Sequence, residues 1–169
     1  MNLIVAVDEC WNIGYNNDLL EKISEDLKNF KRLTINSTII MGRKTFESLP
    51  GKKALPKRTN IILSSSLSLE NNEEIIVCHS LNEVFDKIKD IPTEKIFIIG
   101  GETIYKQFLP FCDTAFVTKI HNSYTADKSM VNLDLDDNWQ ITEKGEILKN
   151  INNISYQFLI YKQKSTKLL

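Results

Sequence analysis

The sequence lacks an excess of charge of either sign, and it lacks a long uncharged apolar run. Its 169 residues carry 21 Lys and Arg against 22 Asp and Glu, which leaves a formal net charge of −1. A chain without a basic field is a poor ligand for nucleic acid or anionic lipid. The first apolar run follows no basic segment and ends at Asp8, too soon for a signal peptide or a membrane helix. We therefore expect a cytoplasmic protein with a small soluble ligand, and neither nucleic acid nor membrane as a partner.

Cysteine and histidine are also scarce. Cys10, Cys78 and Cys112 share no CxxC spacing and fall in or beside apolar runs, so we expect all three to be small core hydrophobes. The two histidines, His79 and His121, lie far apart without ligand-spaced partners. The sequence therefore predicts no metal site.

Linkers, repeats and heptads are absent from the chain as well. Hydrophobic residues make up 42% of the sequence and charged residues 25%, the composition of an ordinary globular protein. A chain of this length can bury one sizeable core. We expect one domain over residues 1–169, working as a monomer, with residues 163–169 as a flexible tail.

Apolar runs with strand character alternate with segments of helical period through the first two thirds of the chain. The runs are nearly continuous, which is typical of strands buried on both faces, and the alternation predicts an α/β fold with a mostly parallel sheet. The strands are expected at residues 3–7, 38–41, 60–63, 74–77, 95–99 and 114–120, and the helices at 24–33, 44–49, 81–89 and 103–109. Two extended stretches, 139–147 and 154–162, flank a polar turn and predict a C-terminal antiparallel hairpin at one sheet edge.

The GxGxxG fingerprint of Rossmann enzymes is missing after the first strand, so a dinucleotide would need another cradle. One candidate is the segment IIGGETIY, residues 98–105, where a strand ends in Gly100 and Gly101 and a helix begins at once. Glycine allows a ligand to approach the backbone, and the first N–H groups of a helix suit a phosphate. A plain strand-to-helix turn would look the same.

Two further strand ends carry phosphate-binding chemistry. The first strand end reads Gly42, Arg43, Lys44 and Thr45, and the second reads Leu63 followed by serines at 64–66. Ligands of open parallel sheets bind outside the carboxyl ends of the strands. Three such ends suit a dinucleotide with an extra phosphate, which Arg43 could grip with two hydrogen bonds.

Asp26 is the most conspicuous acid of the sequence. Helical spacing places it beside the apolar stripe of Ile23, Leu27 and Phe30, and Ser24 is the expected N-cap. A carboxylate against an apolar wall usually has a function, although an acid in a first helical turn also suits the helix dipole. Arg58, just before a strand, could clamp a ligand carboxylate or could be a surface charge.

Together these segments resemble the bacterial-type dihydrofolate reductase family over nearly the whole chain. The resemblance rests on LIVAVD, DLKNFK, IIMGRKTFESL, LPKRTNIILSS, IFIIGGETIYKQFLP and the closing hairpin. It implies an eight-stranded mixed sheet with flanking helices that binds NADPH across the carboxyl ends of the strands. The implied activity is reduction of 7,8-dihydrofolate to tetrahydrofolate by hydride transfer to C6 and protonation of N5, for one-carbon metabolism, and antifolates would be inhibitors.

The resemblance also assigns residues. Asp26 and Thr118 would be the catalytic pair, with the acid holding the pterin and the hydroxyl bonding to the acid. The substrate pocket would be lined by Ile4, Val5, Leu27, Phe30, Leu49, Leu55 and Ile99, with Arg58 on the glutamate tail. The cofactor would be bound by Ala6, Ile13, Gly14, Asn17, Leu19, Gly42, Arg43, Lys44, Thr45, Leu63, Ser64, Ser65, His79, Gly100, Gly101, Glu102, Thr103, Ile104 and Tyr105. The Gly100–Gly101 peptide is expected to be cis, a rare form for residues other than proline.

The chain departs from the family pattern in three places. Glu21 stands where the family usually has a tryptophan, and we expect it to loosen the neighbouring loop and bring a second carboxylate near the cofactor. Residues 126–129 read Ala-Asp-Lys-Ser instead of a glycine, aspartate, threonine loop, so coupling to the segment 13–19 is expected to differ. His79 stands where a Lys or Arg often holds the adenosine 2′-phosphate.

Two other functions are open at this point. A pyrimidine reductase of riboflavin synthesis shares this fold and its paired-glycine loop, but Asp26 and Arg58 suit a pterin with an acidic tail better. A non-catalytic nucleotide-binding module would explain the strand ends and leave Asp26, Thr118 and Arg58 without a role.

Overall fold

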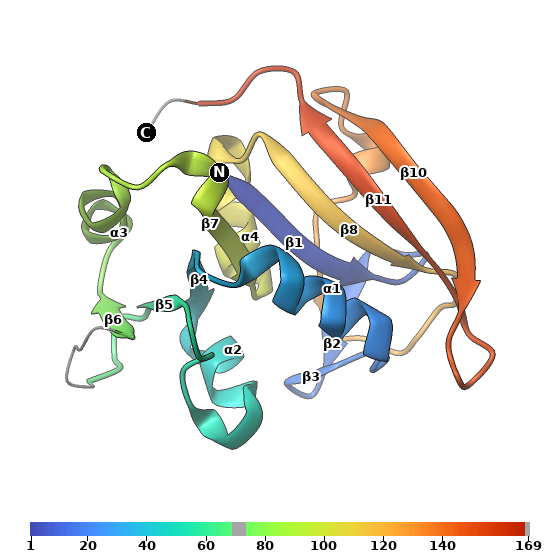
Figure 1. Cartoon of the computed structure of the whole chain (residues 1–169), viewed down its shortest axis with the longest axis horizontal. Helices are drawn as coiled ribbons and strands as arrows, with labels where there is room; N and C mark the ends of the chain where they lie inside the picture. Colours follow the sequence, from blue (N-terminus) through green and yellow to red (C-terminus); the bar gives the residue numbers. More distant parts are fainter. Residues whose placement is uncertain (69–73, 168–169) are drawn as a thin grey trace.

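The fold is built on one twisted sheet of eight strands, as a computed structural model of the chain shows for residues 1–68 and 74–167 (Figure 1). The strand order is β10-β11-β8-β1-β7-β4-β5-β6. The strands from β8 to β6 run parallel, and β11 and β10 are antiparallel at one edge. Their bounds are β1 (Asn2–Val7), β4 (Thr38–Gly42), β5 (Thr59–Leu63), β6 (Ile75–Cys78), β7 (Ile96–Gly100), β8 (Thr114–Ile120), β10 (Trp139–Lys149) and β11 (Ser155–Gln163).

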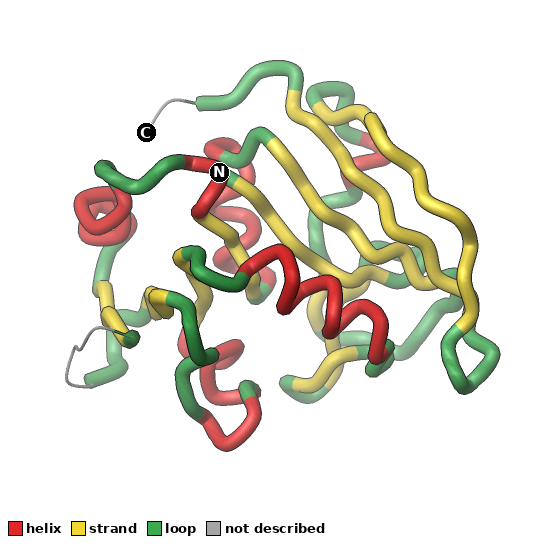
Figure 2. The backbone as a smooth tube through the Cα atoms, viewed as in Figure 1, coloured by secondary structure: helices red, strands yellow, loops and turns green. Residues whose placement is uncertain are grey.

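Helices cover both faces of this sheet, and α1 and α4 lie on opposite sides of it (Figures 1 and 2). The α-helices are α1 (Ser24–Thr34), α2 (Arg43–Ser48), α3 (Leu81–Ile88) and α4 (Glu102–Phe108), and the short 3-10 helices are η1 (Pro50–Lys52), η2 (Thr93–Lys95), η3 (Leu109–Phe111) and η4 (Leu133–Leu135). The central strands are nearly continuous apolar runs because both of their faces are covered. The predicted elements are confirmed, each within two residues of its bounds. The mixed, mostly parallel α/β sheet is confirmed as well.

A second, small sheet was not predicted. It has the order β3-β2-β9, with β2 (Asn12–Tyr15), β3 (Asp18–Leu19) and β9 (Lys128–Ser129). Strands of two to four residues leave almost no periodicity in a sequence, which is why this sheet escapes pattern reading. It joins the segment after β1 to the 126–129 loop, and both flank the cleft described below.

The turn that leads into β2 is organised by Asp8, whose side chain is fully buried. Its carboxylate accepts hydrogen bonds from the backbone N–H groups of Cys10 (2.8 Å), Asn12 (2.9 Å) and Tyr124 (3.1 Å), and from the Asn12 amide (3.0 Å). A buried carboxylate persists when several donors satisfy it. Asp8 thus fixes the start of the small sheet against the loop after β8.

Two local predictions are wrong. Cys10 is exposed in the Asp8 turn, whereas Cys78 and Cys112 are buried as expected, because the turn carries Cys10 out of the core. The N-cap of α1 is Ile23 rather than Ser24, and no side chain caps this end. Ile23 is buried in a cluster with Ile120 and Tyr156, so packing fixes where the helix begins.

The segment after β11 returns along the sheet toward the N-terminus (Figure 2). The backbone N–H of Lys164 donates to the Asn138 carbonyl at 2.8 Å, and that of Lys167 donates to the Pro110 carbonyl at 2.9 Å. The flexibility expected of residues 163–169 stays a prediction, and residues 168 and 169 lie outside the described part of the chain.

Candidate active site

A cavity of about 1130 Å³ runs along the carboxyl ends of the central strands. Residues from β1, β4, β5 and β7 reach it, together with α1, α2, α4 and the small sheet. Ligands of open α/β sheets bind at this edge. Most of the residues assigned from sequence line it together, and the four that do not are Leu55, Arg58, Gly100 and Thr118.

Asp26 lies at one end of the cavity, in the first turn of α1. Its Oδ1 accepts a hydrogen bond of 2.5 Å from the Thr118 hydroxyl. Burial raises the pKa of this carboxyl above the ordinary aspartate value, and the Thr118 hydrogen bond opposes part of that rise. A single hydroxyl donor leaves Asp26 less satisfied than Asp8, with acceptor capacity for a ligand.

Thr118 reaches Asp26 from β8, behind the cavity rather than on its lining. Its backbone position is fixed between two partners, Ala6 on β1 and Phe158 on β11. The central sheet therefore sets the position of the hydroxyl, and the hydroxyl sets the orientation of the carboxylate.

Apolar side chains form the wall next to Asp26. Ile4 and Val5 come from β1, Leu27 and Phe30 follow Asp26 along α1, and Leu49 and Ile99 close the far side. Leu55 does not line the cavity and packs instead against the buried cluster that includes Ile39 and Met41. A flat aromatic ring with one polar edge would suit this wall and acid.

Arg58 is buried behind the lining rather than in it. Its Nε donates to Thr34 Oγ1 and its Nη1 to the Pro56 carbonyl, each at 2.8 Å. The guanidinium carbon lies 5.8 Å from the centre of the Phe30 ring, and Phe30 itself lines the cavity. The guanidinium has donors beyond these two, so the clamp on a ligand carboxylate stays a prediction.

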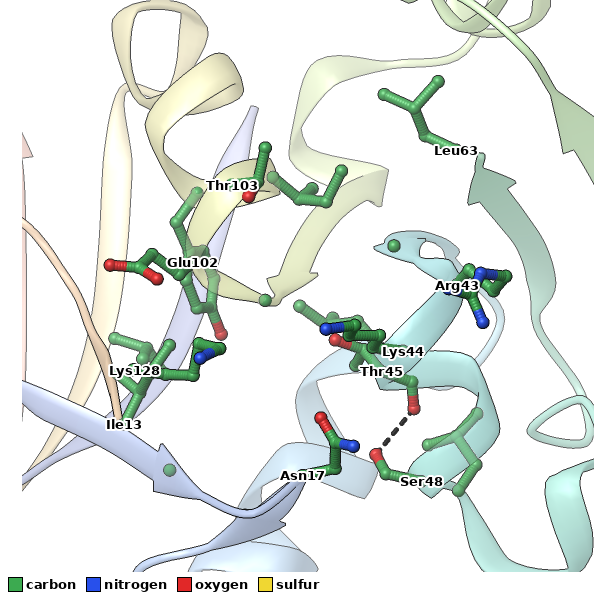
Figure 3. A pocket seen from close by; sticks show the side chains of 18 of the residues that line it. Ile13, Asn17, Arg43, Lys44, Thr45, Ser48, Leu63, Glu102, Thr103 and Lys128 are labelled. Atoms are coloured by element: carbon green, nitrogen blue, oxygen red, sulfur yellow. Dashed lines mark hydrogen bonds between the residues drawn. The ribbon is translucent and has the colours of Figure 1, made fainter. Parts of the chain in front are cut away.

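The other end of the cavity carries cations and hydroxyls. Figure 3 shows Arg43, Lys44 and Thr45 on one wall, with Thr103 and Glu102 of α4 facing them across the cavity. Arg43 pairs with Glu47 at 2.7 Å. Phosphate groups require hydrogen-bond donors, and this end supplies them from Arg43, Lys44, Thr45, Ser64 and Ser65.

The paired glycines keep this end open. A Cβ atom added at Gly101 would lie 3.3 Å from Thr45 Oγ1, and one at Gly100 would lie 3.2 Å from the Tyr105 ring. The Gly100–Gly101 peptide is cis, as predicted. Gly100 itself is buried beneath the cavity, and Gly101 lines it. The narrow gap between two strand ends therefore fits a dinucleotide whose diphosphate approaches the backbone closely.

His79 extends this end of the cavity. Its Nδ1 lies 2.8 Å from the Ser64 carbonyl oxygen, which orients the ring beside the serines that follow β5. The next residue, Ser80, caps α3 by accepting a hydrogen bond from the Glu83 N–H. A ligand phosphate at this end would thus meet a histidine in addition to Arg43.

Glu21 points away from the cavity, and the expectation of a second carboxylate near the cofactor is wrong. Its Oε1 accepts from the amides of Asn150 (3.1 Å) and Asn152 (3.3 Å), and its Oε2 accepts from the Tyr124 hydroxyl (3.2 Å). These donors belong to the turn between β10 and β11 and to the loop after β8. They hold the segment before α1, so Glu21 fastens the loop that it was expected to loosen.

The altered loop at 126–129 remains joined to the segment 13–19. Lys128 pairs with Gly14 in the small sheet, and the Asp127 backbone N–H donates to the Gly14 carbonyl at 3.1 Å. These contacts are made by backbone groups, so they do not depend on the side chains at 126–129. The expected difference in coupling therefore stays a prediction about side chains.

Sequence reasoning missed several lining residues. Most of them are neighbours in sequence of residues that were assigned, and they would have been included if more residues had been counted on each side of every strand end. They are Tyr15, Asp18, Lys22, Ser48, Pro50, Ser66, Ser80, Leu81, Gln107 and Lys128. Lys128 comes from a separate segment, and its only signal was the departure from the family pattern.

The arrangement joins a phosphate-binding end to an apolar end with one half-buried acid. The family model for dihydrofolate reductase matches residues 1–163. Dihydrofolate reductase from Bacillus subtilis is 35% identical over 167 residues, covering 98% of this chain and 96% of the relative. That from Staphylococcus haemolyticus is 35% identical over 163 residues, covering 96% and 95%.

A solved structure agrees with these relatives. Dihydrofolate reductase from Enterococcus faecalis, complexed with NADP(H) and RAB-propyl, superposes with a TM-score of 0.84 at 29% identity, covering 97% of this chain and 96% of that one. No helix in the described part of the chain is long and apolar enough to cross a membrane. With a family model over nearly its full length and relatives at this identity, the chain belongs to the dihydrofolate reductase family.

Proposed function

We infer that this chain is an NADPH-dependent dihydrofolate reductase that converts 7,8-dihydrofolate to 5,6,7,8-tetrahydrofolate for one-carbon metabolism. The observation that carries the inference is Asp26, a half-buried carboxylate with one hydroxyl donor at the apolar end of a cavity whose other end suits phosphates. Neither a ribityl-phosphate substrate nor mere nucleotide binding would require that acid. The family assignment favours the same function over both alternatives.

The pterin is oriented by Asp26. One carboxylate oxygen is bonded to Thr118, and the remaining acceptor sites take the N3 and 2-amino hydrogens of the pterin edge. The apolar wall of Ile4, Phe30 and Ile99 would enclose the ring and shield its faces from bulk water. Arg58, one layer behind Phe30, is the group assigned to the carboxylate of the glutamate tail.

The cofactor would lie along the rest of the cavity. Its phosphates would be held by Arg43, Lys44, Thr45, Ser64 and Ser65, with Arg43 on the extra phosphate of the adenosine. The nicotinamide would face Ala6, Ile13 and Gly14. When bound, NADPH supplies the hydride that C6 of the substrate accepts.

Reduction of the substrate also requires one proton at N5. Asp26 does not reach N5 from the pterin's amino edge, so water delivers the N5 proton. The negative charge of Asp26 in a water-poor pocket favours the protonated substrate. Because burial raises the pKa of Asp26, this charge is lost at a higher pH than that of an ordinary aspartate, and its influence depends on pH.

A monomer in the cytoplasm is part of the same proposal. One chain carries both ends of the cavity, with Asp26 at one end and Arg43 at the other. The three free thiols are compatible with a reducing compartment. Antifolates that carry a flat diamino ring would compete for Asp26.

A spectrophotometric assay tests the function. NADPH consumption is followed with dihydrofolate and, in parallel, with the ribityl-phosphate pyrimidine that a riboflavin-pathway reductase uses. We expect rapid turnover with dihydrofolate alone. Turnover with the pyrimidine, or NADPH binding without turnover of either compound, would contradict the proposal.

A further inference from the structure

Lys128 enters the cofactor end of the cavity from the wall opposite Arg43. Figure 3 shows its side chain beside Ile13 and near Glu102, while Arg43 and Leu63 lie across the cavity. Two contacts fix this placement. Lys128 pairs with Gly14 in the small sheet, and its neighbour Ser129 donates to Glu102 Oε1 at 3.3 Å.

The ammonium group of Lys128 is held loosely. It donates to the Asp127 carbonyl at 2.8 Å and lies 3.4 Å from the Asp127 carboxylate, and the side chain is 39% exposed. Both contacts are with the adjacent residue, so they cost little to exchange. A lysine has three donors and a long flexible stem, which allows it to meet a ligand anion in the cavity.

The other cations that line the cavity are arranged differently. Lys22 pairs with Asp18 at 2.9 Å, and Arg43 pairs with Glu47 at 2.7 Å on the opposite wall. Glu102 adds negative charge on the wall of Lys128, although it pairs with Lys106 at 3.3 Å. A phosphate between the two walls would face Lys44 and Thr45 on one side. On the side of Glu102 it needs a compensating cation, and Lys128 is placed to supply one.

We propose that Lys128 is a cofactor-binding residue that contacts the diphosphate of the dinucleotide, opposite Lys44 and Thr45. The proposal rests on the proposed function, because it assumes that NADPH occupies this cavity. Gly101 and Thr45 bound the narrow gap that the diphosphate would cross, and Lys128 lies on the Glu102 side of it. The adenosine 2′-phosphate would bind at the far end, with Arg43 and His79.

This placement separates two kinds of charge. The diphosphate is common to NADPH and NADH, whereas the 2′-phosphate belongs to NADPH alone. Loss of the Lys128 charge should therefore weaken the binding of NADPH and of NADH by the same factor. Loss of Arg43 should weaken NADPH much more than NADH.

The experiment titrates NADPH and NADH into the full chain by fluorescence, at low and at high salt, for the wild type, Lys128→Gln, Arg43→Gln and Lys144→Gln. Lys144→Gln is the matched control, since it removes the same charge from an exposed position of β10 outside the cavity lining. Thermal unfolding without ligand verifies that each variant is folded.

We expect Lys128→Gln to raise the dissociation constants of both cofactors roughly 5- to 10-fold at low salt, the net contribution of about one solvent-exposed hydrogen bond. The loss should shrink at high salt, and Lys144→Gln should bind as the wild type does. Equal affinities in Lys128→Gln and Lys144→Gln would overturn the proposal, and so would a loss confined to NADPH. A wild-type chain that binds neither cofactor would instead overturn the proposed function.

Discussion

Two carboxylates near the start of α1 have opposite surroundings. Asp26 meets a single hydroxyl donor inside the cavity, and burial raises its pKa. Glu21 meets three donors outside the cavity, from Tyr124, Asn150 and Asn152. A carboxylate supplied with donors by its own chain has a structural role, whereas one left with free acceptor sites in an apolar pocket is prepared for a ligand.

The largest expected effect is on catalysis at Asp26. Asp26→Asn keeps the shape and one acceptor for Thr118 but removes the charge that orients and polarises the pterin. We expect hydride transfer at neutral pH to fall roughly 100- to 1000-fold, with NADPH affinity unchanged. Single-turnover stopped-flow kinetics measures the rate of hydride transfer, and fluorescence titration measures the NADPH affinity. Near-normal hydride transfer would remove Asp26 from the mechanism.

The same variant should be more stable at neutral pH. Because the pKa of Asp26 is raised, the folded protein holds a proton at pH values where the unfolded chain has lost it. Stability therefore falls as pH rises from the ordinary aspartate value through the folded pKa. Asp26→Asn should recover about 1.4 kcal/mol for each unit of that difference, and nothing at pH below the ordinary value. Urea unfolding at several pH values measures this. A variant less stable than the wild type at neutral pH would contradict the unsatisfied state of the acid.

Thr118→Val should have an intermediate effect. Its hydroxyl lowers the pKa of Asp26, so its loss should raise that pKa further and shift the pH profile of hydride transfer upward. We expect roughly a 10-fold lower rate at neutral pH. Thr142→Val is the control, since the Thr142 hydroxyl bonds the Ile160 carbonyl on the exposed strand β10. If the profiles of the two variants coincide with the wild type, Thr118 does not act through Asp26.

The smallest effect is expected at Glu21. Glu21→Ala removes three partly exposed hydrogen bonds and should lower the free energy of unfolding by about 1 kcal/mol. The pH profile of hydride transfer should stay unchanged, because Glu21 does not line the cavity. Thermal unfolding and single-turnover kinetics are compared with Glu146→Ala, an exposed acid of β10. A shifted pH profile in Glu21→Ala but not in Glu146→Ala would show that Glu21 influences the active site.

The strands of the sheet and the place of Asp26 beside the apolar residues of α1 could be predicted from the sequence. Buried strands such as β4 and β7 are continuous apolar runs, and their glycine ends mark the cavity without help from tertiary structure. Asp26 could be singled out because helical spacing alone places it beside Leu27 and Phe30.

The surroundings of Glu21 could not be predicted in this way. Its three donors come from Tyr124 and from the turn between β10 and β11, far along the chain, and no local pattern brings them together. The small sheet that carries Lys128 depends likewise on pairing between distant short strands. The fold alone decides which of these two acids is left with a single donor.

The most direct test of this difference is the pH dependence of single-turnover hydride transfer, from about pH 5 to about pH 9, in the wild type, Asp26→Asn and Glu21→Gln. The account predicts one shared titration, above the ordinary aspartate pKa, in the wild type and Glu21→Gln, and its disappearance in Asp26→Asn. A titration that survives in Asp26→Asn, or that is lost in Glu21→Gln, would contradict it.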